Sequence, residues 1–427
     1  MEHPNSQRAL AYFDDLFPLE QKPMATQLRV AHSRNDIIAD ILSFDGFGAS
    51  TIHETKNEIP YFVNEFWTSG QRQAHSIHEV SYRACFKAQL PEFFISRLTE
   101  VGDSVYDPFM GRGTTPVQAA LQGRRPLGND INPLSKLLVR PRLEPPSLFD
   151  VADALAAVPW TRPVEMREDL LAFYHPETLH RLTNLRDFLL ENIPIADEAP
   201  DPVLDWIRMV AINRLTGHSP GFFSVYTLPP NQAVSVDAQR KINAKRSQSP
   251  EPRDIARIII KKSKSLMSDG QMPPHPVGKL LTGASTVSNG VNKGEVDLVI
   301  TSPPFLDIVQ YAQDNWLRCW FAGIDVSQVD IAMHRTQGSW TAMVRETLAE
   351  QARIVRSGGH VAFEVGEVRG GKVLLEQLVW QAAEGLPFER LGVMVNQQNF
   401  TKTANCWGVT NNSGGTNTNR IVLLRRD

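Results

Sequence analysis

The stretch Asp107-Pro-Phe-Met-Gly-Arg-Gly-Thr-Thr115 decides the fold class. It follows a short apolar strand expected at Ser104–Tyr106 and opens a helix expected over Thr115–Leu121. Gly111 and Gly113 let the backbone turn sharply and let a ligand approach without a Cβ in the way. Open α/β sheets bind their ligands at this position, the carboxyl end of a strand.

The residues on either side of this turn predict a βαβ unit. An apolar spacing at 89–98 indicates a helix before the first strand, and a second strand is expected at Pro126–Ile131, after a stop at Gly123. Strand–helix–strand units pair in parallel through a right-handed crossover. Further strands are expected at Val296–Ile300, His360–Val365, Leu391–Val395 and Arg420–Leu424.

The predicted fold class is therefore α/β, with a Rossmann-like and mostly parallel sheet. Helical patterns separate the first three of these later strands, as parallel pairing requires. A long polar turn containing Asn411–Asn419 joins the last two, so they are expected to pair as an antiparallel hairpin. The amides of this turn are most simply a connection, with contact to DNA as the alternative.

Changes in pattern along the chain predict three regions. Residues 1–75 show weak periodicity and are expected to form an N-terminal extension. Residues 76–145 and 277–427 carry the strands of the core. Proline-rich stretches separate that core from residues 146–276, which hold helical patterns and are expected to form a largely helical insertion.

The composition fits a protein with a buried core and no membrane segment. Apolar residues make up 42% of the 427 residues, and no apolar run is long enough to cross a bilayer. The N-terminus lacks the layout of a secretion signal. Cys85, Cys319 and Cys406 are far apart, which argues against a disulfide framework or a metal site and favours the cytoplasm.

Charge is segregated along the chain although the net charge is only −3. Residues 150–205 contain 12 acidic against 4 basic residues, whereas residues 240–264 contain 9 basic against 2 acidic ones, a local charge of +7. Such a basic run is either a solvated face or a surface that follows nucleic-acid phosphates. In the second case, the expected contact residues are Arg240, Lys241, Lys261, Lys262 and Lys264.

Two carboxylates flank the glycine turn and favour S-adenosylmethionine (AdoMet) as the ligand. Asp107 stands where a pyrophosphate would lie, which disfavours an anion but suits the cationic ammonium of a methionine moiety. Asp130 ends the second strand, in position to accept hydrogen bonds from ribose hydroxyls. A nicotinamide or phosphate site is the competing interpretation of the turn, and simple turn capping that of each carboxylate.

A second motif, Asp297-Leu-Val-Ile-Thr-Ser-Pro-Pro-Phe305, runs from an apolar strand straight into Ser302, Pro303, Pro304 and Phe305. The prolines fix the backbone and donate no N–H. Nearby carbonyls are therefore expected to be held in a fixed direction without a hydrogen-bond donor from the protein. These carbonyls and the serine hydroxyl can accept hydrogen bonds from an exocyclic NH2 group and position its nitrogen. The phenylalanine ring can stack on a flipped-out base. The alternative is a strand-terminating turn with a buried ring.

The order DPFMGRGTT, GNDINP, DLVITSPPF resembles the DNA amino-methyltransferases, the enzymes that make N4-methylcytosine and N6-methyladenine. Further pieces match in order, namely SIHEVSYRACFKAQLP (76–91), LLTGAS (280–285), HVAFEVGEV (360–368) and the closing NRIVLLRR. The resemblance implies an AdoMet-dependent enzyme in which Ser302 to Phe305 hold the base. The residues that it places at the cofactor, with Asp107, are Phe109, Gly111, Gly113, Thr114 and Asp130.

The resemblance also implies a reaction, which is methyl transfer to the exocyclic amino group of a flipped base in double-stranded DNA. Residues 146–276 then correspond to a target-recognition region, and a cognate restriction endonuclease is a partner to expect. The serine at 302, where many adenine enzymes have Asp or Asn, favours cytosine N4 over adenine N6. An RNA amino-methyltransferase and a non-catalytic DNA-binding subunit remain alternatives. No Pro-Cys dipeptide exists, so the cysteine nucleophile of cytosine-C5 methylation is missing.

Overall fold

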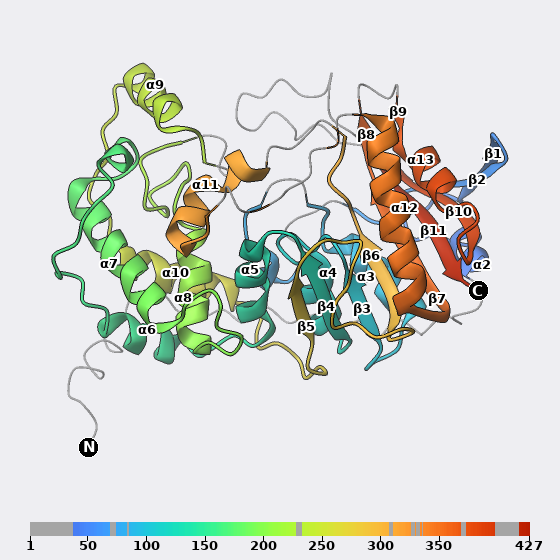
Figure 1. Ribbon diagram of the computed structural model, residues 1–427, viewed down its shortest axis with the longest axis horizontal. Helices are drawn as coiled ribbons and strands as arrows, with labels where there is room; N and C mark the ends of the chain where they lie inside the picture. The colour runs from blue at the N-terminus through green and yellow to red at the C-terminus, as the bar shows by residue number, and fades with distance from the viewer. Residues whose placement is uncertain are drawn as a thin grey trace.

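A computed structural model describes residues 37–68, 74–82, 85–227, 233–306, 311–325, 329, 334, 336–368, 373–397 and 418–427. Within these residues, nine strands form one sheet in the order β1-β2-β10-β11-β7-β6-β3-β4-β5 (Figure 1). The strands are β1 Ile52–Lys56, β2 Ile59–Asn64, β3 Ser104–Asp107, β4 Arg125–Asp130, β5 Lys279–Thr282, β6 Val296–Thr301, β7 Val355–Val365, β10 Phe388–Gln397 and β11 Thr418–Arg426. A separate short hairpin consists of β8 Glu367–Val368 and β9 Val373–Leu374.

The sheet is parallel on both sides of β3. This strand pairs with β4 on one side and with β6 on the other, and β5 and β7 continue the parallel arrangement outward. The direction in which the chain progresses across the sheet therefore reverses at β3, and sheets of this kind bind ligands at such a switch point. β11 returns antiparallel between β7 and β10. The predicted Rossmann-like sheet with a terminal antiparallel hairpin is confirmed.

Two strands come from the segment that was expected to be an N-terminal extension. β2 pairs in parallel with β10, where Tyr61 lies opposite Val393, and β1 pairs antiparallel with β2. Tyr61 belongs to the hydrophobic cluster on one face of the sheet and Phe62 to the cluster on the other face. Because β2 is buried on both faces, its apolar residues do not alternate with polar ones, which explains the weak periodicity. Residues 52–64 are therefore part of the core sheet.

Helices cover both faces of this sheet. α3 (Gln89–Leu98) and α4 (Thr114–Leu121) pack on one face, and α12 (Gln337–Ile354) and α13 (Leu375–Ala382) on the other. α5 (Pro133–Leu143) follows β4 and contributes to a third hydrophobic cluster, which it shares with the helical part of the molecule. The short helix α2 (Ile37–Leu42) lies on the α3 side.

The insertion predicted between residues 146 and 276 is largely helical, and Figure 1 shows its helices gathered beside the sheet. The helices are α6 Leu148–Ala156, η3 Glu168–Ala172, α7 Pro176–Asn192, α8 Pro202–Ile212, α9 Val236–Arg246 and α10 Ile255–Leu266. Across the part of the chain that the structure describes, no helix combines the length and the apolar character needed to cross a membrane.

One helix of the predicted core belongs to the helical part instead. α11 (Tyr311–Ala322) follows the Ser302 loop in sequence, and Figure 1 shows it among the helices of the insertion. Its Leu317 and Phe321 are buried in the same cluster as the apolar residues of α7 and α8. Arg186 of α7 donates a hydrogen bond to the carbonyl of Trp320 over 3.0 Å. Two separate segments of the chain, the insertion and α11, therefore form the helical part.

Candidate active site

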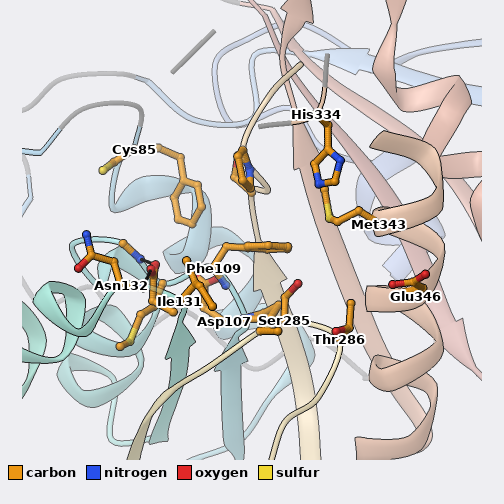
Figure 2. Close-up of a pocket in the computed structure, with 18 of the residues that line it drawn as sticks. Cys85, Asp107, Phe109, Ile131, Asn132, Ser285, Thr286, His334, Met343 and Glu346 are labelled. Carbon is orange, nitrogen blue, oxygen red and sulfur yellow. Dashed lines mark hydrogen bonds between the residues drawn. The ribbon is translucent and has the colours of Figure 1, made fainter. Parts of the chain in front are cut away.

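A cavity of about 470 Å³ opens at the carboxyl ends of β3, β4 and β6 (Figure 2). Its walls come from the glycine turn and the residues before it, the end of β4, the loop after β5, the Ser302 loop and α12. The predicted site residues that line it are Asp107, Phe109, Gly111, Thr114, Asp130, Ser302 and Pro304. The structure thus brings two motifs that are far apart in sequence to one cavity.

Both glycines of the turn adopt backbone conformations with positive φ. Gly111 has a φ of 50° and Gly113 a φ of 78°, in the region that L side chains rarely occupy. A Cβ on Gly113 would also lie 2.3 Å from Cγ2 of Val139 on α5. The absence of a side chain at Gly113 thus allows α4 to start close to α5. Gly111 forms part of the cavity wall, and Gly113 does not.

Asp107 has two functions at the end of β3. Its Oδ1 accepts hydrogen bonds from the Thr301 hydroxyl, over 2.6 Å, and from the Phe109 N–H, over 3.0 Å, so the carboxyl caps the turn. It also lines the cavity while remaining almost completely buried. Burial raises the pKa of Asp107 to about 7, against the opposing effect of these hydrogen bonds. A cation in the cavity would favour the ionised form.

Asp130 connects the end of β4 to the glycine turn. Its Oδ2 accepts a hydrogen bond from Gly111 N over 2.8 Å, and its Oδ1 accepts one from Asn132 N over 2.9 Å. Asn132 in turn caps α5 by accepting a hydrogen bond from Leu134 N. Burial raises the pKa of Asp130. Since a carboxylate oxygen can accept more than one hydrogen bond, the group retains capacity for a hydroxyl donor in the cavity.

The Ser302 loop only partly matches its prediction. Ser302 and Pro304 line the cavity, and Pro303 does not. The carbonyl of Pro304 accepts a hydrogen bond from Trp340 Nε1 over 2.9 Å. This carbonyl therefore already has a partner within the protein, contrary to expectation. The half-buried Phe305 ring lies beside Gly366, the residue that follows β7, where a Cβ on this glycine would be 2.8 Å from the ring. The ring is not part of the cavity wall. The stacking role expected of this ring stays a prediction.

Glu364 is a candidate functional residue that the sequence reasoning missed. It lies on β7, beside β6, and its side chain is buried. Its carboxyl accepts hydrogen bonds from the Ser302 hydroxyl and from Asn419 Nδ2, the latter over 2.9 Å. Burial raises the pKa of Glu364. An acidic residue in the apolar strand HVAFEV was the signal that could have identified it, because buried carboxyls require a specific reason.

The remaining cavity wall contains both polar and apolar residues. The side near β5 and α12 is formed by Ser285, Thr286, Met343 and Glu346 (Figure 2). AdoMet presents a cationic ammonium, a ribose diol and a flat purine. The carboxyls of Asp107 and Asp130 and the apolar surfaces of Phe109, Ile131 and Met343 supply matching partners in a cavity of suitable size. The residues present therefore fit AdoMet.

The five residues predicted to contact nucleic acid lie on two helices. Arg240 and Lys241 are exposed on α9, where Arg240 pairs with Asp237 over 3.1 Å. Lys261, Lys262 and Lys264 lie on α10, whose apolar side packs into the helical core. Lys262 is largely covered, and its Nζ forms an ion pair with Glu79 over 3.0 Å. Lys262 therefore has a role within the protein, whereas Lys261 is exposed.

The fold and the cavity define a protein of the AdoMet-dependent methyltransferase class. Residues 21–137 match the family model described as DNA methylase. The match includes the glycine turn and Asp130, and it begins within the segment that contributes β1 and β2. This match supports assignment of the chain to the DNA amino-methyltransferases, whose cofactor is AdoMet.

Similar proteins include Type II methyltransferases. The chain is 41% identical to M.MjaII of Methanocaldococcus jannaschii over 73 residues, which are 17% of this chain and 13% of that protein. It is 31% identical to M.MvaI of Kocuria varians over 135 residues, 31% of this chain and 27% of that protein. It is 22% identical to M.BsoBI of Geobacillus stearothermophilus over 354 residues, 73% of this chain and 67% of that protein. The matches thus span less than a third of the first two relatives.

Proposed function

We propose that the protein transfers a methyl group from AdoMet to the exocyclic amino group of a flipped base in double-stranded DNA, with cytosine N4 as the target. The observation that carries the proposal is the position of Ser302, which lines the same cavity as the glycine turn and is hydrogen-bonded to Glu364. Similarity to Type II methyltransferases supports DNA as the substrate. A cognate restriction endonuclease stays an expected partner.

The chain's own residues have a positioning role and a proton-accepting role in this reaction. When bound, AdoMet supplies an electrophilic methyl group. The Ser302 Oγ accepts a hydrogen bond from the amino group and holds its nitrogen lone pair toward the methyl group. After attack, the nitrogen must lose a proton, which passes to Ser302 as the Ser302 hydroxyl proton moves to Glu364. The raised pKa of Glu364 suits a group that takes up this proton.

The choice of base rests on the residue at 302. Its serine matches the cytosine-N4 pattern in the resemblance described above, and adenine N6 is the second candidate because adenine presents the same NH2 group. Transfer of tritium from labelled AdoMet to plasmid DNA, to RNA and to protein in parallel tests the substrate class. The proposal expects label in duplex DNA, and label confined to RNA or protein would contradict it.

AdoMet binding should weaken in acid because of Asp107. The AdoMet ammonium attracts the ionised carboxylate, and Asp107 has a pKa of about 7 without it. Affinity is therefore expected to be full above this pH and to fall as pH drops through it, by about eightfold between about pH 7.5 and about pH 6. Calorimetry across this range measures the effect. Adenosine, which lacks the ammonium, is the control and should show no such dependence; an equal dependence for both ligands would contradict the assignment.

DNA binding by the helical part should depend on α9. Replacing Arg240, Lys241 and Lys245 with Gln is expected to flatten the salt dependence of DNA affinity, by about one unit of slope per lost phosphate contact. Lys262→Gln should leave the slope unchanged, because this lysine is paired with Glu79. Fluorescence anisotropy at several salt concentrations measures the slopes.

The matched control for this experiment is the double variant Arg162→Gln, Arg167→Gln. It removes exposed arginines from the acidic segment of the same helical part and should leave the slope as in the wild type. An unchanged slope in the α9 variant would show that this helix is a solvated face.

A further inference from the structure

The residues before the glycine turn form one wall of the cofactor cavity. Residues 76–82, here called the cover segment, end in Tyr82, which lines the cavity. The Tyr82 ring lies 3.5 Å from the position that a Cβ on Gly111 would occupy, so it is in contact with the glycine turn. Arg112 of that turn donates a hydrogen bond to the carbonyl of Val80 over 2.9 Å. One side of the cover segment is therefore held by the cofactor site.

The other side of the cover segment is held by the helical part. Arg318 of α11 donates a hydrogen bond through Nη2 to the carbonyl of Ser81 over 3.1 Å, and its guanidinium lies 5.8 Å from the centre of the Tyr82 ring. Asn213, at the end of α8, accepts a hydrogen bond from the Ser81 N–H over 3.0 Å. Both backbone polar groups of Ser81, the residue before Tyr82, are thus hydrogen-bonded to the helical part, one to Asn213 after α8 and the other to Arg318 of α11.

The two side chains that bind Ser81 are themselves buried, which makes these contacts costly to break. Arg318 is 7% exposed and Asn213 is 3% exposed. A second N–H of Arg318 donates to Asn315 Oδ1 over 2.9 Å, which fixes the guanidinium on its own helix. The ion pair between Lys262 and Glu79 joins α10 to the same segment. A shift of α8 or α11 would therefore move Ser81 and Tyr82 unless buried hydrogen bonds were lost.

We propose that Arg318 is a positioning residue that couples the helical part to the cofactor cavity through Ser81 and Tyr82. This inference rests on the proposed function, in which the helical part binds DNA and the cavity binds AdoMet. DNA bound to the helical part then favours the arrangement of the cover segment that binds AdoMet, and AdoMet favours DNA binding by the same factor, as thermodynamic linkage requires.

Calorimetry with S-adenosylhomocysteine, which cannot transfer a methyl group, tests the coupling independently of the reaction. Plasmid DNA should increase the affinity of the wild type for S-adenosylhomocysteine by about tenfold. Arg318→Gln should weaken the affinity about tenfold without DNA and remove most of the effect of DNA. Arg318→Lys keeps an N–H donor for the Ser81 carbonyl and should recover part of both. In steady-state assays, Arg318→Gln should raise KM for AdoMet while kcat at saturation changes less than about twofold.

The matched control is Arg186→Gln, which removes another guanidinium–carbonyl bond to α11, at Trp320, away from the cover segment. It should bind S-adenosylhomocysteine like the wild type, with and without DNA. If Arg318→Gln does not fold, as judged by thermal unfolding, Asn213→Ala takes its place, because it removes the partner of the Ser81 N–H. Wild-type affinity and DNA response in the folded variant would overturn the coupling, while methylation of DNA by the wild type would leave the proposed function standing.

Discussion

Replacing Asp107 with alanine or asparagine is expected to weaken AdoMet binding about a hundredfold or more. The carboxylate is the buried acidic group at the end of β3, and without its charge the AdoMet ammonium would enter a buried site without its counter-charge. Asparagine keeps an oxygen that can accept the hydrogen bonds from Thr301 and Phe109, so this variant separates the charge from the capping function. Calorimetry measures the affinity and thermal unfolding reports on the turn.

A second variant serves as the control for this prediction. Thr301→Val removes one hydrogen bond to Asp107 but leaves its carboxyl, so at a pH well above 7 it should retain most of the AdoMet affinity. If Asp107→Asn binds AdoMet as tightly as the wild type, the carboxyl only caps the turn and another group must hold the ammonium.

Replacing Glu364 with glutamine is expected to slow methyl transfer by about 10²–10⁴-fold, the usual contribution of a group that accepts a proton in catalysis. Glutamine can still accept the Ser302 hydrogen bond but cannot take up the proton. Ser302→Ala should reduce kcat comparably, and the double variant should be little slower than the worse single variant, because the two groups act as one unit. AdoMet affinity should change little in all three. Single-turnover kinetics with labelled AdoMet separates the transfer step from binding.

Glu376 provides the matched control for Glu364. It is also a buried glutamate, but it lies on α13 and pairs with Arg420 of β11 over 3.0 Å. Glu376→Gln should lower the thermal stability and leave the transfer rate near that of the wild type. A Glu364→Gln enzyme with wild-type kcat would show that Glu364 is only a structural partner of Ser302.

The parts of the fold that were predictable from sequence are those in which local pattern and tertiary environment agree. The glycine turn between a buried strand and a helix predicted the central βαβ unit, since strained backbone positions select glycine. β2 was missed because burial on both faces removes the alternation that marks a strand. α11 has an ordinary helical pattern, and nothing in that pattern says which part of the molecule its apolar side packs against.

The candidate site shows the same division. Asp107, Asp130 and Ser302 stand at strand ends, where topology alone brings side chains together. The positions of Phe305 and of the Pro304 carbonyl depend on Gly366 and Trp340, which come from later elements. Likewise, the pairing of Lys262 with Glu79 could not be read from a run of basic residues. Contacts between distant elements decide these cases, and a single sequence carries no local signal for them.

The proposed methylation of cytosine N4 is tested most directly by nucleoside mass spectrometry of plasmid DNA from cells that express the protein and lack other DNA amino-methylases. We expect N4-methylcytosine in wild-type samples, and its loss in samples from cells that express Asp107→Asn or Glu364→Gln. N6-methyladenine in place of N4-methylcytosine would change the base and leave the mechanism intact. Unmodified DNA, or 5-methylcytosine alone, from cells that contain the folded protein would contradict the central claim.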